Sequence, residues 1–156
     1  MSIIEVFTDG ACTSNGKKFA KGGIGIYFPN GEHEPISEQY VSDKITNQRA
    51  ELYAIYKALL TITQKIEYKK IVIYTDSEYS INCVTKWVKL WVKNNWRTAS
   101  NKPVLNIDII KPIYEILNNN KRKVKFIHVR SHTGNTDYKS LGNHMADTLA
   151  TSGIVQ

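Results

Sequence analysis

Val6-Phe7-Thr8-Asp9-Gly10 and Val72-Ile73-Tyr74-Thr75-Asp76-Ser77 are two apolar runs that end with the same residue types, an aromatic residue, a threonine and an aspartate. Continuous apolar runs of this kind predict strands in the interior of a sheet. If the two strands are parallel neighbours, Asp9 and Asp76 lie at one edge of that sheet. A carboxylate in such a place is solvated, caps the next element or holds a cation. Because the ending occurs twice, it favours a cation site.

The sequence on either side of these stretches alternates between strand and helix patterns. Apolar runs between turn signals predict strands over residues 3–12, 22–29, 36–42, 70–75 and 123–130. Helical periodicity predicts helices over residues 47–64, 77–94, 103–119 and 143–152. The first three strands follow one another at hairpin spacing, whereas the last two are reached across helices. The sequence therefore predicts one α/β domain over residues 1–156, with a mixed sheet covered by helices.

The composition limits the partner and the compartment. The 156-residue chain carries a formal net charge of +7, which favours a polyanionic partner. The two cysteines, Cys12 and Cys83, are too few for a disulfide framework and lack the spacing of a zinc site, so we expect a reducing compartment. No stretch has the pattern of a signal peptide or a membrane span. We therefore expect an intracellular, cytoplasmic protein with no membrane partner.

Two further acids lie on predicted helices. Glu51 shares one helix face with four apolar residues that must pack on the sheet, namely Ile55, Ala58, Leu59 and Ile62. Asp147 borders a second apolar stripe, which consists of Met145, Ala146, Leu149 and Ala150. A carboxylate at the buried edge of such a stripe needs a partner.

The four acids are more informative together than singly. Taken one at a time, each has an ordinary explanation as a helix cap or a solvated side chain. Like charges held close together raise one another's pKa unless cations neutralise them, so the set favours a metal site. Ligands that are oxygen atoms alone indicate magnesium or manganese in place of zinc or copper. The set consists of Asp9, Glu51, Asp76 and Asp147.

The motifs of the chain, in their order, resemble those of ribonuclease H of type 1, and the resemblance covers nearly the whole sequence. The matching stretches are TDG at 8–10, SNG at 14–16, GGIG at 22–25, TNQRAE at 46–51, YTDS at 74–77, a Trp-rich basic segment, VRSH at 129–132 and GN at 142–143 before AD at 146–147. TNQRAE and the Trp-rich segment are more similar to the eukaryotic-type branch, without its separate hybrid-binding module. The resemblance implies a ribonuclease H-like fold with five strands in the order 3-2-1-4-5, the first three antiparallel.

The resemblance also implies an activity and its residues. It implies an endoribonuclease that hydrolyses the RNA strand of RNA/DNA hybrids and leaves 5′-phosphate and 3′-hydroxyl ends. Two Mg²⁺ ions, with Mn²⁺ as an alternative, would be held by the four acids named above. His132 would assist proton or metal movement and product departure. The expected partner is the hybrid duplex, bound by a monomer.

Recognition of the hybrid is implied at three sets of residues. The set expected to contact RNA 2′-hydroxyls is Asn15, Asn47 and Gln48, although Asn15 is also a plausible turn residue and Asn47 a plausible helix N-cap. The set expected to hold the DNA strand is Tyr79, Trp87 and Trp91, in a helix that places Lys86, Lys89 and Lys93 on its other side. Without the resemblance, the tryptophans would be read as core residues. The phosphate pocket would consist of Lys44, Thr46 and Asn106.

Two departures and two alternatives stay open. Lys44 stands where eukaryotic-type relatives usually have arginine, and the segment between His132 and Gly142 is several residues longer than usual. A related nuclease that acts on DNA is one alternative, against which the 2′-hydroxyl set argues. A noncatalytic module that binds hybrids is the other, against which the four acids argue.

Overall fold

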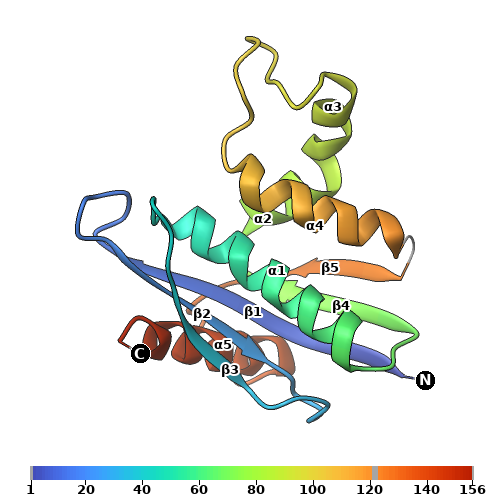
Figure 1. Cartoon of the computed structure of the whole chain (residues 1–156). Helices are drawn as coiled ribbons and strands as arrows, with labels where there is room; N and C mark the ends of the chain where they lie inside the picture. The colour runs from blue at the N-terminus through green and yellow to red at the C-terminus, as the bar shows by residue number, and fades with distance from the viewer. Residues whose placement is uncertain (1, 121–122, 156) are drawn as a thin grey trace.

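The computed structural model describes residues 2–120 and 123–155, and its centre is a five-stranded mixed sheet (Figure 1). The strands are β1 (Ile3–Thr13), β2 (Lys21–Tyr27), β3 (Ile36–Tyr40), β4 (Lys70–Thr75) and β5 (Val124–His128). Their order is β3-β2-β1-β4-β5, with β1, β2 and β3 antiparallel and with β4 parallel to both β1 and β5. The predicted fold class and strand order are confirmed.

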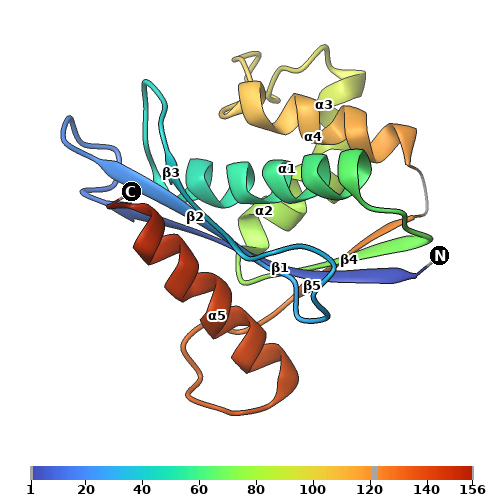
Figure 2. The ribbon, with the colours of Figure 1, turned by 60° about the horizontal axis from the view of Figure 1, so that its bottom comes forward.

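Helices cover both faces of the sheet. Helices α1 (Asn47–Lys65) and α4 (Ile107–Asn119) lie on one face, and α5 (Tyr138–Gly153) lies alone on the other (Figure 2). Strand β1 is therefore buried on both sides. Ile4 and Val6 belong to the core beneath α1, whereas Phe7 belongs to a smaller cluster beneath α5. This double burial explains why β1 is a continuous apolar run and does not alternate.

Helix α1 follows its prediction closely. Thr46 is the N-cap, since its hydroxyl accepts a hydrogen bond from the Arg49 N–H at 3.1 Å. The predicted apolar face is fully buried along its whole length, and its members are Ile55, Ala58, Leu59 and Ile62. Burial of each large aliphatic side chain contributes roughly 1.5–3 kcal/mol, so this face fixes α1 on the sheet.

Helix α5 differs from its prediction. It begins at Tyr138, five residues before the predicted start, and it runs through Gly142. A Cβ atom on Gly142 would lie 2.3 Å from the Phe7 ring, so this glycine permits close packing and does not end a helix. Met145 is 41% exposed, so the predicted stripe is wrong at that position. The buried residues of α5 are Gly142, Asn143, Ala146, Ala150 and Gly153.

The predicted helix over 77–94 is interrupted. It consists of α2 (Glu78–Asn82), a π-helical turn (Cys83–Trp87) and α3 (Val88–Lys93). The next helix begins at Ile107 and not at the predicted residue 103, because Asn106 adopts a left-handed conformation with φ of 64°. Residues 83–106, called the protrusion below, stand away from the sheet (Figure 1). Among the described residues, no helix is both long enough and apolar enough to span a membrane.

Candidate active site

Strand register brings Asp9 and Asp76 together. The last residue pair of the β1–β4 ladder is Phe7 with Tyr74, and each aspartate lies two residues beyond it. Asp76 follows the end of β4, as predicted. Asp9 does not end β1, because β1 continues to Thr13 and Asp9 pairs with Gly25 of β2. The two carboxylates are therefore level with each other at the point where the parallel ladder stops.

Glu51 joins them from the first turns of α1. The Gly10 N–H donates a hydrogen bond to its carboxylate, which binds α1 to β1 beside Asp9. A Cβ atom on Gly10 would lie 2.3 Å from the Glu51 backbone nitrogen, so only glycine permits this approach. Carboxylate oxygens of Asp9, Glu51 and Asp76 all lie within 4.8 Å of one another.

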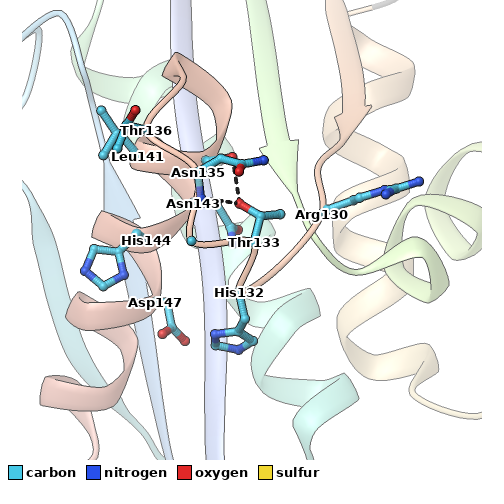
Figure 3. Close-up of a pocket in the computed structure, with 11 residues that line it drawn as sticks. Arg130, His132, Thr133, Asn135, Thr136, Leu141, Asn143, His144 and Asp147 are labelled. Atoms are coloured by element: carbon cyan, nitrogen blue, oxygen red, sulfur yellow. Dashed lines mark hydrogen bonds between the residues drawn. The ribbon is translucent and has the colours of Figure 1, made fainter.

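Asp147, from α5 on the other face of the sheet, and His132, from the loop after β5, lie beside the three clustered acids. Both line the same cavity of about 300 Å³ as the three clustered acids. Asp147 projects from α5 but does not belong to the group of mutually close oxygens. His132 lies in the loop after β5 with a left-handed backbone, φ 52°, and its side chain is near Asp147 (Figure 3).

Burial raises the pKa of two of the clustered acids, Asp9 and Glu51. Burial of the carboxyl group, with the negative charges of Asp76 and Asp147, raises the pKa of Asp9 to about 8. Burial and the charge of Asp9 also raise the pKa of Glu51 well above its ordinary range. Asp9 and Glu51 therefore resist being ionised together, because each negative charge disfavours the other in this buried place. A divalent cation beside them would favour the ionised form of both carboxyl groups.

The donor set fits a hard divalent cation. The three clustered groups offer oxygen atoms alone, and two of them, Asp9 and Glu51, are 5% and 9% exposed. Buried carboxylates that cannot all ionise side by side gain from a cation that neutralises them. Among the described residues, the cluster of Asp9, Glu51 and Asp76 is the one group of acids, histidines or cysteines that meets this spacing.

The residues expected to contact 2′-hydroxyls lie beside the acids. Asn47 and Gln48 are exposed and line the same cavity as the clustered acids. The Asn15 side-chain oxygen accepts a hydrogen bond from the Asn47 N–H at 2.8 Å, which joins the β1–β2 loop to the start of α1. The suggestion that Asn47 is an N-cap is wrong, because Thr46 is the cap.

Arg49 organises the residues expected to form the phosphate pocket. It donates to the Lys44 carbonyl at 3.0 Å and to the Asn106 side-chain oxygen at 3.2 Å, and it forms an ion pair with Asp108 at 2.6 Å. Thr46 caps the same helix. Sequence reasoning passed over Arg49, although a charged residue between buried positions of a helix signals a buried partner.

The aromatic residues expected at the DNA strand form a row. The ring of Trp87 lies 6.0 Å from that of Tyr79 and 6.1 Å from that of Trp91, between centroids. All three rings pack against the core and stay partly exposed, so the core-packing alternative is met while part of each ring faces solvent. Val84 and Val88 are buried on the same side, whereas the three lysines of the segment, Lys86, Lys89 and Lys93, are exposed as predicted.

One further histidine supports the site. The His128 ring nitrogen Nε2 lies 3.2 Å from the Asp76 carbonyl oxygen, so it helps to fix the backbone of that acid. Sequence reasoning assigned His128 no role. The signal for it is its register, because His128 pairs with Thr75, directly before Asp76, across the β4–β5 ladder.

Known proteins resemble this chain over most of its length. The RNase H family model matches residues 1–155. A probable ribonuclease H of Acanthamoeba polyphaga mimivirus is 43% identical over 140 residues, which are 88% of this chain and 60% of that protein. Ribonuclease H1 of Rattus norvegicus is 37% identical over 153 residues, which are 98% of this chain and 50% of that protein. The chain thus spans about half to three fifths of the length of these relatives.

A solved structure agrees with the fold. The foamy viral protease-reverse transcriptase in complex with dsDNA matches with a TM-score of 0.78 and 26% identity, over 97% of this chain and 93% of that one.

Proposed function

The chain belongs to the RNase H family, and we propose that it is a metal-dependent endoribonuclease that hydrolyses the RNA strand of RNA/DNA hybrids. The observation that carries the proposal is the convergence of Asp9, Glu51 and Asp76 within 4.8 Å at the end of the β1–β4 ladder. The products would be a 5′-phosphate and a 3′-hydroxyl. One copy of the chain holds every residue that the proposal uses, so we propose a monomer.

Asp9, Glu51, Asp76 and Asp147 would hold two Mg²⁺ ions, or Mn²⁺ in their place. When bound, such ions activate a water molecule and stabilise the charge on the phosphate and the departing oxygen. The residues of the chain supply the rest. Asp9 and Glu51, whose pKa values are raised by burial, would be ionised by the nearby cations. His132, exposed on a loop at the cavity, is placed to carry a proton or assist product departure.

Selection of an RNA strand would depend on Asn15, Asn47 and Gln48. An amide side chain donates and accepts hydrogen bonds, as a 2′-hydroxyl does, and the hydroxyls line the minor groove of an A-like duplex. Asn47 and Gln48 stand beside the clustered acids. A strand cut at those acids would therefore present its sugars to these amides.

The DNA strand would lie on the protrusion and the phosphate pocket. The row of Tyr79, Trp87 and Trp91 offers partly exposed rings for stacking. The pocket of Lys44, Thr46 and Asn106 is held together by Arg49. Lys44 attracts a phosphate as a point charge, without the paired hydrogen bonds that arginine would give.

The test is a cleavage assay on four substrates of one sequence: RNA/DNA hybrid, double-stranded RNA, single-stranded RNA and double-stranded DNA, each with magnesium and with chelator. We expect cleavage of the RNA in the hybrid alone, abolished by chelator. Cleavage of DNA would favour a related nuclease, and tight binding without cleavage would favour a noncatalytic module. Replacement of the 2′-hydroxyls around the cut site by deoxyribose should slow cleavage, and an unchanged rate would refute the sugar contacts.

A further inference from the structure

The side chain of Asn106 is enclosed between two partners. Asn106 lies directly before α4, which packs against α1 (Figure 1), and it is 8% exposed. Its side-chain oxygen accepts from Arg49 at 3.2 Å, and its side-chain nitrogen donates to the Tyr79 hydroxyl at 3.0 Å. Its carbonyl oxygen accepts from the N–H groups of Ile109 and Ile110, each at 3.0 Å. Backbone and side chain of Asn106 are therefore both held in one orientation.

Arg49 decides which end of the amide faces it. A guanidinium donates hydrogen bonds and accepts none, so the amide atom next to it has to be the oxygen. Arg49 is itself fixed, because all of its side-chain nitrogens donate. Its other acceptors are both carboxylate oxygens of Asp108 at 2.9 and 2.6 Å, the Lys44 carbonyl at 3.0 Å and the Ser42 hydroxyl at 3.3 Å. The nitrogen end of the Asn106 amide is therefore directed away from Arg49.

Tyr79 fixes that nitrogen end. Its hydroxyl accepts one N–H of Asn106. Burial and a hydrogen bond with Cys83 raise the pKa of Tyr79 to about 12, so the hydroxyl stays neutral beside the amide. The ring of the same residue packs against Trp87 in the aromatic row. The Tyr79 hydroxyl thus connects the aromatic row to a member of the proposed phosphate pocket.

One N–H of the Asn106 amide is left for a ligand. An amide nitrogen carries two hydrogens, and in residues 2–120 and 123–155 this nitrogen donates to Tyr79 alone. A donor on a buried side chain is costly to leave without an acceptor. A phosphate oxygen is a suitable acceptor, and Lys44, whose backbone is bonded to the same Arg49, adds positive charge.

We propose that the Tyr79 hydroxyl is a positioning residue of the phosphate pocket: with Arg49 it clamps the Asn106 amide, so that the second N–H is presented to a phosphate of the DNA strand. The proposal rests on the proposed function, which assigns that pocket to the DNA strand. Tyr79 then has two separate roles, since its ring stacks and its hydroxyl orients the amide. Loss of the hydroxyl alone should weaken one phosphate contact and leave stacking unchanged.

The first experiment measures hybrid binding without turnover, with calcium in place of magnesium. One strand of a DNA duplex carries a short window of ribonucleotides, which fixes the binding position. Each phosphate of the DNA strand opposite the window is replaced in turn by an uncharged methylphosphonate. In the protein, one replacement should weaken affinity ~3- to 10-fold, as for one lost hydrogen bond. Tyr79→Phe should bind the unmodified hybrid ~2- to 5-fold more weakly and lose most of its sensitivity at that one phosphate.

Tyr68→Phe is the matched control. The Tyr68 hydroxyl is also hydrogen-bonded to an asparagine amide, that of Asn120, which lies at the other end of α4 from Asn106. Its loss should leave the methylphosphonate pattern as it is in the protein. Thermal unfolding of both variants separates a general loss of stability from the loss of one contact.

Asn106→Asp supplies the second variant. Arg49 and Tyr79 can both donate to a carboxylate, and aspartate tolerates the left-handed backbone of this position, so the fold should be kept. The carboxylate presents no N–H to a phosphate, and sensitivity at the one position should disappear. Tyr79→Phe should then add little to Asn106→Asp, because the hydroxyl acts through the amide.

Three binding results would overturn the clamp. One is Tyr79→Phe with unchanged affinity, and another is equal weakening for every hybrid with full sensitivity kept at the one phosphate. The third is additivity of Tyr79→Phe and Asn106→Asp, which would show that the hydroxyl acts elsewhere. Failure of the protein to cut the unmodified hybrid in magnesium, with the expected binding pattern, would instead refute the proposed function, which keeps the two failures apart.

Discussion

The acid cluster and the protrusion are fixed by the chain in opposite ways. Asp9 and Glu51 are 5% and 9% exposed, and strand register and the Gly10 N–H hold them in place. The protrusion carries four left-handed residues, Asn95, Trp96, Asn101 and Asn106, and its lysines are exposed. The acid cluster holds its carboxylates in fixed, buried positions. The protrusion presents aromatic rings and lysines to solvent. Substitutions should therefore have all-or-none effects in the first region and graded effects in the second.

The largest expected effect is the loss of turnover in Asp76→Asn. Each acid lost leaves the charge of bound cations unbalanced, and we expect the cleavage rate to fall ~10³-fold or more, which corresponds to several kcal/mol of lost charge stabilisation. The fold should stay intact, because Asp76 is only half-buried. Steady-state cleavage at ordinary magnesium and circular dichroism check both points.

Glu78→Gln is the matched control, because Glu78 is an exposed acid two residues away. It should cut at nearly the normal rate. Near-normal activity of Asp76→Asn would sink the assignment of Asp76 as a metal ligand. Calcium, which is larger and tolerates irregular geometry, should support hybrid binding better than turnover.

The second effect is a gain in stability. Asp9→Asn removes a carboxyl group whose burial is unfavourable without a cation, and we expect the metal-free variant to be more stable by ~1–3 kcal/mol. Thermal unfolding in chelator measures this difference. Added magnesium should raise the melting temperature of the protein more than that of the variant, and so narrow the gap.

The stability difference between Asp9→Asn and the protein should depend on pH in a definite direction. The pKa of Asp9 is raised to about 8 in the folded protein, so its contribution to stability is full below its ordinary pKa and is lost as pH rises through about 8. The gap between variant and protein in chelator should thus widen from acid pH to above pH 8. A gap that narrows over this range would contradict the raised pKa.

Three of the four acids chosen from the sequence, Asp9, Glu51 and Asp76, lie together, because short-range signals encode their positions, whereas Asp147 lies outside this group. The repeated Thr-Asp ending marks the level of Asp9 and Asp76, and the periodicity of α1 places Glu51 on its buried face. The predictions that were wrong, namely the starts of α5 and α4, depend on tertiary contacts. The predicted helix begins at residue 143, whereas Gly142 lies inside α5, where the Phe7 ring occupies the space that a side chain would need, and no local pattern reveals that contact. Helix α4 begins later than predicted because Asn106, just before it, has a left-handed backbone conformation. Asparagine adopts this conformation only where the surrounding structure favours it.

The protrusion shows the same limit. Helical periodicity correctly separated the aromatic side from Lys86, Lys89 and Lys93, yet it did not reveal the π-helical turn over Cys83–Trp87. A π-helical turn shifts the register by one residue and depends on packing more than on local propensity. For the protrusion, the residue types alone suggested contacts with nucleic acid, but they did not predict the backbone geometry.

The third effect is smaller and separates two roles of one ring. Trp91→Ala should weaken hybrid affinity by ~1–2 kcal/mol if the exposed part of the ring stacks on nucleic acid. Because Trp91 is half-buried against Trp87, stability should fall by a similar amount and less than for a fully buried ring. Hybrid affinity and thermal unfolding are measured on the same sample. A lowered melting temperature with unchanged affinity of the folded protein would remove Trp91 from the binding surface.

The smallest expected effect tests the charges of the protrusion alone. Lys86, Lys89 and Lys93 are exposed on the side opposite the buried valines, so their neutralisation to glutamine should leave the fold and the aromatic row unchanged. Each lysine that contacts a phosphate contributes roughly 0.9 to the slope of log affinity against log salt, on the scale measured for B-form DNA, so the triple variant should give a flatter slope and a few-fold weaker binding at moderate salt. Lys65→Gln, at the far end of α1 from the protrusion, is the control and should keep the original slope (Figure 1).

An unchanged slope in the triple variant would mean that these lysines only solubilise the protrusion, and that its binding to the duplex comes from the aromatic rings. A flattened slope with an unchanged melting temperature would place charge and stacking on separate faces of one segment, in contrast to the acid cluster, where burial and charge cannot be separated.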